Sequence, residues 1–181
     1  MLNNYYKSKH NNYCTPEEIY SAILKFTNNI KFNIDVCCNN TNIPAHRHIM
    51  SKGLEESWNG ICFMNPPFNE INKWLKKAFN EVNRTKDDII KCDVWCIMPG
   101  NRMNTKYMQS LLNSHSNWFI AALDGRFNFI VPDCEDETNI NRNNGGLNTQ
   151  IFILYIGNKK QLYLYQWNIN SPIKSILLSR P

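Results

Sequence analysis

The residues most suited to chemistry, by their types and spacing, form one short turn, Asn65-Pro66-Pro67-Phe68. The Asn65 side-chain oxygen and the Pro66 carbonyl are two hydrogen-bond acceptors on neighbouring residues. Together they could hold both hydrogens of a planar amine, so that the nitrogen lone pair is drawn out of its conjugated system. Pro67 would stiffen the turn and keep both oxygens aimed. The turn therefore predicts a site that makes a poor amine nucleophile reactive.

Phe68 extends this prediction to a nucleobase, since adenine carries such an amine at N6. Rotating an adenine out of a duplex costs a few kcal/mol, while stacking on an aromatic ring returns about 1–3 kcal/mol. Two hydrogen bonds of about 0.5–1.5 kcal/mol each bring the sum close to balance. A plain turn would also explain Asn and Pro here, but the position of the tetrapeptide between an apolar strand and a helix favours a site.

The elements beside the tetrapeptide predict where it lies in a fold. The apolar run 61–64 stops abruptly, as a buried parallel strand does, and apolar residues recur at helical spacing over 71–82. On that helix Lys73, Lys76 and Lys77 share the other side, which we expect to be a solvated face that could also contact a duplex backbone. Open α/β sheets hold ligands at the carboxyl ends of their strands, so the tetrapeptide is well placed.

The remaining periodicity predicts one domain over 15–181, preceded by a loose arm over 1–14. Thr15, Pro16 and Glu18 have the spacing of a helix start in which the Thr15 hydroxyl caps the helix. The early alternation of helices and strands predicts an α/β fold with a mostly parallel sheet and antiparallel C-terminal edge strands. We predict helices over 15–26 and 105–112, strands over 31–36, 94–98, 118–123, 127–131, 150–156 and 162–167, a loop over 39–60 and a hairpin-like turn over 157–160.

Composition sets broad limits. The chain has 181 residues, of which 43% are hydrophobic, and a net charge of +5 that is compatible with a polyanionic partner without demanding one. Seven scattered cysteines are typical of a reducing compartment, so we expect a cytoplasmic protein without a membrane segment. His46 and His48 suggest zinc together with nearby cysteines such as Cys37, Cys38 or Cys62, but no CxxC pair frames them, so no metal is expected.

The chain resembles the phage-type DNA N6-adenine methyltransferases, the phage Dam family, over residues 14 to 157. The matching segments, in chain order, are Thr15-Pro16, Phe32-Asn33-Ile34-Asp35-Val36-Cys37-Cys38, Asn42, Gly53-Leu54, Trp58, Asn65-Pro66-Pro67-Phe68, Trp74, Met98-Pro99-Gly100-Asn101-Arg102 and Gly125-Arg126-Phe127-Asn128-Phe129. The resemblance implies a Rossmann-like methyltransferase fold, S-adenosylmethionine as methyl donor, adenine in double-stranded DNA as acceptor, and a phage or mobile-element origin.

The resemblance also implies roles for individual residues at the cofactor. Thr15 and Pro16 would lie beside the cofactor carboxylate, where free helix amides suit an anion. Asp35 would lie near its ammonium group or ribose hydroxyls, and Cys37 and Asn42 would belong to the same site. The glycine-rich turn that many methyltransferases carry after this strand is missing, and no second acidic ribose ligand can be identified.

Three further residues are candidates for DNA contact. Arg102 and Thr105 follow the strand 94–98 and would share an edge with Asn65 if the strands are neighbours, which places them near DNA phosphates. Arg126 is a candidate of the same kind. A solvated surface role explains Arg102 equally well.

Two other functions use the same residues. An adenine in RNA or a glutamine side-chain amide is also a planar nitrogen that needs two acceptors. A nucleic-acid-binding module could instead keep the fold and lose the chemistry, although intact Asn65 and Phe68 argue against that.

Overall fold

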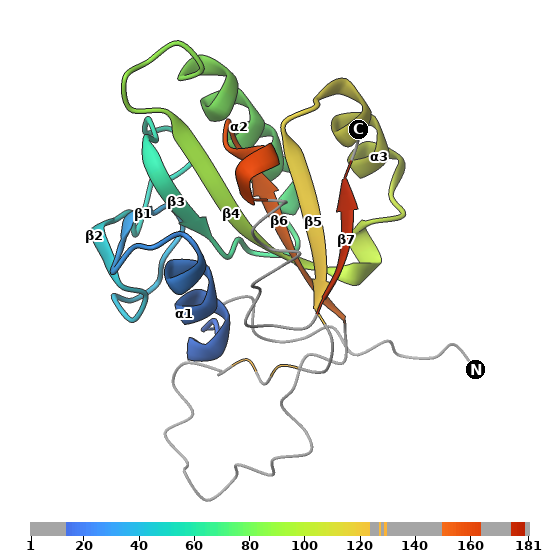
Figure 1. The fold of residues 1–181 in the computed structure, drawn as a ribbon. Helices are drawn as coiled ribbons and strands as arrows, with labels where there is room; N and C mark the ends of the chain where they lie inside the picture. The colour runs from blue at the N-terminus through green and yellow to red at the C-terminus, as the bar shows by residue number, and fades with distance from the viewer. Residues whose placement is uncertain (1–13, 124–126, 128, 130–149, 164–174, 180–181) are drawn as a thin grey trace, which may run out of the picture.

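The apolar run before the tetrapeptide forms β3 (Gly60–Met64), an inner strand of the sheet in the computed structural model. The structure describes residues 14–123, 127, 129 and 150–163, together with the backbone of 175–179. Within these residues one seven-stranded sheet has the order β2-β1-β3-β4-β6-β5-β7 (Figure 1). The other strands are β1 (Phe32–Asp35), β2 (Ala45–His48), β4 (Cys92–Pro99), β5 (Trp118–Leu123), β6 (Ile151–Ile156) and β7 (Ser175–Ser179), and the helices are α1 (Glu17–Phe26), α2 (Ile71–Arg84), the short 3-10 helix η1 (Gly100–Arg102) and α3 (Lys106–Ser114).

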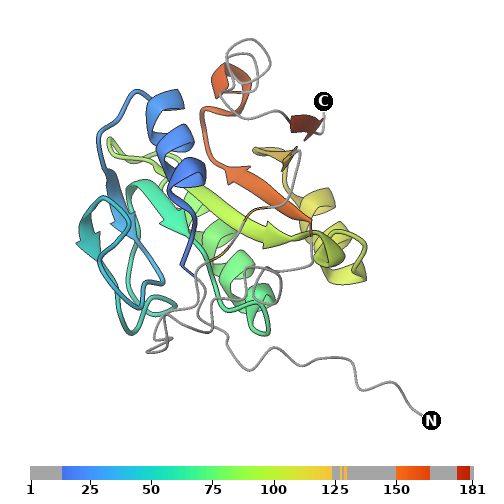
Figure 2. The same cartoon turned by 90° about the horizontal axis from the view of Figure 1, so that it is seen from below.

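Helices cover both faces of this sheet. α1 packs on one face and α2 and α3 on the other, as Figure 2 shows. Strand residues alternate between the two apolar clusters, so that Cys62 and Val94 face α2 whereas Phe63 and Trp95 face the side of α1. Every residue of β4 is buried, which explains why the sequence of this strand is an unbroken apolar run apart from Asp93.

The sheet is mixed, with most strands in one direction and antiparallel C-terminal strands as predicted, but the place of one of these strands corrects the predicted arrangement. The pairings among β2, β1, β3 and β4 are parallel, whereas β6 pairs antiparallel with both β4 and β5, and β7 pairs antiparallel with β5. The antiparallel strand β6 therefore lies inside the sheet, and only β7 is an antiparallel edge. The sequence did not reveal that β6 lies between β4 and β5, because apolar periodicity shows which residues are buried but not which strands pair with each other.

Three local predictions were wrong. β2 forms inside the region predicted as a loop; as an edge strand it buries little, and its polar sequence hid it. Leu162 and Tyr163 are helical, so the turn over 157–160 leads into a helical turn and not into a hairpin strand. Thr15 does not cap α1, because Pro16 occupies the N-cap position and no side chain caps the helix. Residues 1–13 of the arm predicted over 1–14 and most of the strand predicted over 127–131 lie outside the described residues.

A buried polar cluster ties β6 to β4 at the edge where β4 begins. The Tyr155 hydroxyl donates to Asp93 Oδ1 at 2.8 Å and accepts from the Lys159 backbone N–H at 2.8 Å. The Asn158 N–H donates to the same carboxylate oxygen at 2.9 Å. Burial raises the pKa of Asp93, while these hydrogen bonds lower it in part. The cluster therefore fixes the register of the inserted strand with buried, mutually satisfied groups.

We expect Tyr155→Phe to lower the free energy of unfolding by about 1–3 kcal/mol, because it removes the hydroxyl that donates to the buried Asp93 carboxyl and accepts from the partly buried Lys159 N–H. Chemical denaturation measures the loss. Tyr107→Phe is the control, since the Tyr107 hydroxyl donates to the Asn72 carbonyl at a more exposed position. Equal losses in both variants would contradict the importance of burial at Tyr155.

Candidate active site

A cavity of about 530 Å³ opens where β1, β2 and β3 end. Its walls come from the start of α1, from the segments that follow these three strands, and from Trp74 of α2. After β1 the chain turns outward to β2 and then returns to the opposite side of β1 as β3, so the strand order reverses at this point. Open α/β sheets bind ligands at such switch points.

The pairing of β1 with β3 brings the two predicted halves of the site together. Asp35 is opposite Phe63 in the parallel register, and the Val36 N–H donates to the Phe63 carbonyl at 3.0 Å. Just beyond, the Asn65 backbone N–H is hydrogen-bonded to the Cys37 thiol. The acid that ends β1 and the amide that follows β3 are therefore at one edge of the sheet, on the same cavity.

Asp35 is the buried acid of this cavity, with only 3% of its surface exposed. Burial raises the pKa of its carboxyl to about 7, although the Cys37 backbone N–H and the nearby His48 lower it in part. His48 ends β2 opposite Asp35 in register, and its Nε2 is 2.8 Å from the Ile43 carbonyl, which orients the ring. An uncompensated carboxylate here favours a cationic ligand.

The start of α1 supplies hydrogen-bond donors, which suit an anion, whereas Asp35 suits a cation. Thr15 is 7% exposed, lines the cavity, and its Oγ1 is hydrogen-bonded to no described residue. Pro16 is buried behind it as the N-cap, and the first backbone N–H used within the helix is that of Ile19. Amides at a helix start and a hydroxyl without a partner suit an anionic group.

The tetrapeptide lines the cavity with all four residues, but its ring is partly occupied by packing. Phe68 is half-buried and contacts both apolar clusters of the sheet. Its carbonyl accepts a hydrogen bond from Arg102 Nη2 at 3.1 Å. Arg102 therefore holds the backbone of the turn from the next strand end.

Most of the predicted site residues meet in this cavity, whereas two of the three residues proposed for DNA contact are not part of its wall. Arg102 and Thr105 do not line it. Thr105 is the N-cap of α3, where its Oγ1 accepts from the Met108 N–H, and Arg126 lies outside the described residues. The predicted residues on the cavity wall are Thr15, Asp35, Cys37, Asn42, Asn65, Pro66, Pro67 and Phe68.

The sequence analysis missed part of the wall. The segment 49–53 after β2 and the side chains of Tyr20 and Trp74 also line the cavity. From the sequence, Trp74 and Gly53 are named only among the residues that match the family, with no role at the site, and the segment 49–53 lies in a region predicted as a loop. Gly53 was the residue that could have indicated this part of the wall. Only glycine fits there, because a Cβ would lie 2.1 Å from the Val36 carbonyl oxygen.

Other predicted features have ordinary surroundings. Lys73 pairs with Glu70 on the surface, but Lys77 is mostly buried and pairs with Glu81, so the lysine side of α2 is not uniformly solvated. Among the described residues, no group of three or more histidine, cysteine or acidic side chains could hold a metal ion. In the same part of the chain, no helix combines the length and apolarity needed to cross a membrane.

The fold and the cavity define a class, the α/β proteins that bind a ligand at a switch point between parallel strands. Residues 3–165 match a family model described as DNA N-6-adenine-methyltransferase (Dam). This match spans most of the chain, and the chain therefore belongs to the DNA N-6-adenine-methyltransferase (Dam) family. Searches of curated proteins and of solved structures found no match.

We expect Asp35→Asn to stabilise the ligand-free protein at pH 8. The folded pKa lies above the usual value of 3.8, so the protonated acid is favoured by folding, and its contribution is complete below about pH 4 and lost as the pH rises through about 7. The free energies of unfolding of wild type and variant should therefore diverge by a few kcal/mol between pH 4 and 8. Denaturant titrations across this range measure the difference, and parallel pH profiles would contradict it.

Proposed function

We propose that this chain transfers the methyl group of S-adenosylmethionine to the N6 amine of adenine in double-stranded DNA. The observation that carries the proposal is the joint placement of Asp35 and Asn65 on one cavity, in a chain of the Dam family. The first residue is a buried acid suited to a cation, and the second is an amide suited to an amine.

The acceptor side of the site consists of the tetrapeptide. Asn65 Oδ1 and the Pro66 carbonyl accept the two hydrogens of N6, which turns the nitrogen lone pair toward the methyl group. Pro67 restricts the backbone, and Phe68 offers a ring face to the extruded base. The N6 proton leaves for solvent after transfer, so no general base with a shifted pKa is needed.

The donor side of the cavity fits the charges of S-adenosylmethionine. The cofactor has a carboxylate, an ammonium and a sulfonium, and when bound it supplies an electrophilic methyl group. Thr15 Oγ1 and the free amides after Pro16 suit the carboxylate, Asp35 suits a cationic group, and Cys37 and Asn42 contribute wall. The buried hydroxyl of Thr15, which has no hydrogen-bond partner within the described part of the chain, is the structural observation that supports this orientation.

The finer parts of the proposal rest on the same site. The reversal of strand order between β1 and β3, with α2 crossing between the parallel strands β3 and β4, supports a Rossmann-like methyltransferase fold in one domain over 15–181. Arg102 and Thr105 already hydrogen-bond to the backbone. They would contact DNA only through the side-chain atoms that these hydrogen bonds do not use. We retain a phage or mobile-element origin as part of the proposal.

The purified protein incubated with labelled S-adenosylmethionine and unmethylated DNA tests the reaction. We expect label in DNA, recovered as N6-methyladenine after digestion to nucleosides. Parallel incubations with RNA and with a glutamine-containing protein acceptor measure the alternatives. Label only in RNA or protein would replace the acceptor, and DNA binding without cofactor binding would establish a non-catalytic module.

We expect Asn65→Ala to reduce turnover by about 100-fold or more, the usual cost of removing one hydrogen-bonding group aimed at the reacting centre. Its affinity for S-adenosylmethionine should stay close to that of wild type, because Asn65 is assigned to the acceptor. Steady-state methylation and calorimetry with the cofactor measure the two effects.

Asn80→Ala is the matched control, since Asn80 is an exposed residue of α2 outside the cavity wall. It should change neither quantity. A parallel fall of cofactor affinity and turnover in Asn65→Ala would refute the assignment of Asn65 to the amine.

A further inference from the structure

A second tryptophan supports the cavity wall from behind. Trp58 is fully buried and does not line the cavity. Its indole Nε1–H donates to the Gly53 carbonyl at 2.9 Å, and its ring stacks on Trp74, with centroids 6.3 Å apart and an angle of 19° between the planes. Gly53 and Trp74 both line the cavity. One side chain thus contacts two separate pieces of the wall.

Gly53 and Trp74 also pack directly against each other. Trp74 Nε1 is buried and hydrogen-bonded to no described residue, so packing orients the ring. That packing is tight, because a Cβ on Gly53 would lie 2.7 Å from the Trp74 ring. A shift of Trp58 would therefore move Gly53 and Trp74 together, and with them the segment 49–53.

Trp58 is itself held by an ionic cluster on α2 that surrounds the buried carboxylate of Glu81. Glu81, 4% exposed, accepts a hydrogen bond from the Trp58 backbone N–H at 3.0 Å. Arg84 donates to both Glu81 and the Trp58 carbonyl, and Lys77 donates to the other Glu81 oxygen. The Lys77 ammonium also lies 5.6 Å from the centre of the Trp58 ring. Both the backbone and the ring of Trp58 are thus fixed.

The cluster keeps Glu81 charged. Burial would raise the pKa of Glu81, but the hydrogen bonds from Arg84, Lys77 and Trp58 outweigh it and lower the pKa. A charged acceptor makes stronger hydrogen bonds than a neutral one, so the anchor of Trp58 is rigid at neutral pH.

We propose that Trp58 is a positioning residue for the cofactor, which sets the donor wall of the cavity through Gly53 and Trp74 without touching the ligand. This rests on the proposed function, because it takes the ligand on that wall to be S-adenosylmethionine. Trp58 thereby controls cofactor affinity and leaves the acceptor turn at Asn65 unaffected.

The test is Trp58→Phe, which keeps an aromatic ring against Trp74 and removes the N–H that binds Gly53. We expect the dissociation constant for S-adenosylmethionine to rise about ten-fold, the scale of one lost buried hydrogen bond, while turnover at saturating cofactor is retained. In the ligand-free protein, amide hydrogen exchange in a peptide over 49–56 should become faster.

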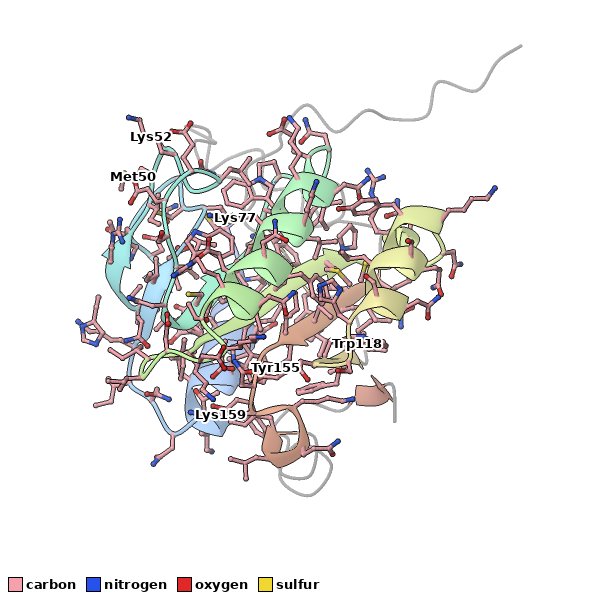
Figure 3. All side chains as sticks on the ribbon, turned by 90° about the horizontal axis from the view of Figure 1, so that it is seen from above. Met50, Lys52, Lys77, Trp118, Tyr155 and Lys159 are labelled. Atoms are coloured by element: carbon pink, nitrogen blue, oxygen red, sulfur yellow. The ribbon has the colours of Figure 1, made fainter. Side chains whose placement is uncertain are left out.

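Trp118→Phe is the matched control. Trp118 is buried, its Nε1 donates to the Leu112 and His115 carbonyls, and it does not line the cavity. Figure 3 shows it on the far side of the molecule from Met50 and Lys52 of the cavity rim. This variant should lose comparable thermal stability, yet keep cofactor affinity and the exchange rate over 49–56.

The outcomes separate this inference from the proposed function. Unchanged affinity and exchange in Trp58→Phe, or equal changes in both tryptophan variants, would overturn the positioning role. If wild type binds no S-adenosylmethionine, the proposed function fails, while the exchange measurement still decides whether Trp58 fixes the segment 49–53.

Discussion

The site depends on the parallel pairing of β1 with β3. Parallel strands run in the same direction, so the segments that follow β1 and β3 leave the sheet at the same edge. The register places Asp35 opposite Phe63, and both strands stop within a residue or two of that pair. An acid and an amide that are 30 residues apart in sequence therefore face one cavity.

Burial of Asp35 gives the cavity its preference for a ligand. A carboxyl taken out of water is stabilised in its neutral form unless a cation lies beside it, and here the raised pKa shows that protein groups compensate only in part. The part of the Asp35 charge that protein groups do not compensate could be compensated by a cationic ligand. Under the proposed function, the stability that the fold loses at neutral pH would be recovered when a cationic group binds, a trade-off that active sites often show.

Several polar or aromatic side chains beside the site hydrogen-bond to the backbone. Arg102 holds the carbonyl of Phe68, Thr105 caps α3, and Trp58 holds the carbonyl of Gly53. These contacts fix loops that have no regular hydrogen-bond partners of their own. A loop at the end of a strand keeps its geometry only when side chains satisfy and pack its backbone, so a precise site needs this supporting layer.

The sequence by itself determined most local elements and identified the turn at 65–68 as the candidate site. Strong apolar periodicity located α2, β3, β4 and β5 to within two residues, and the Asn65 turn could be recognised because it interrupts such a run. Only the tertiary structure decided that β6 lies between β4 and β5, that polar β2 is an edge strand, and that Trp74 faces the cavity. Periodicity records which residues are buried, whereas strand order and cavity walls depend on contacts between residues far apart in the chain.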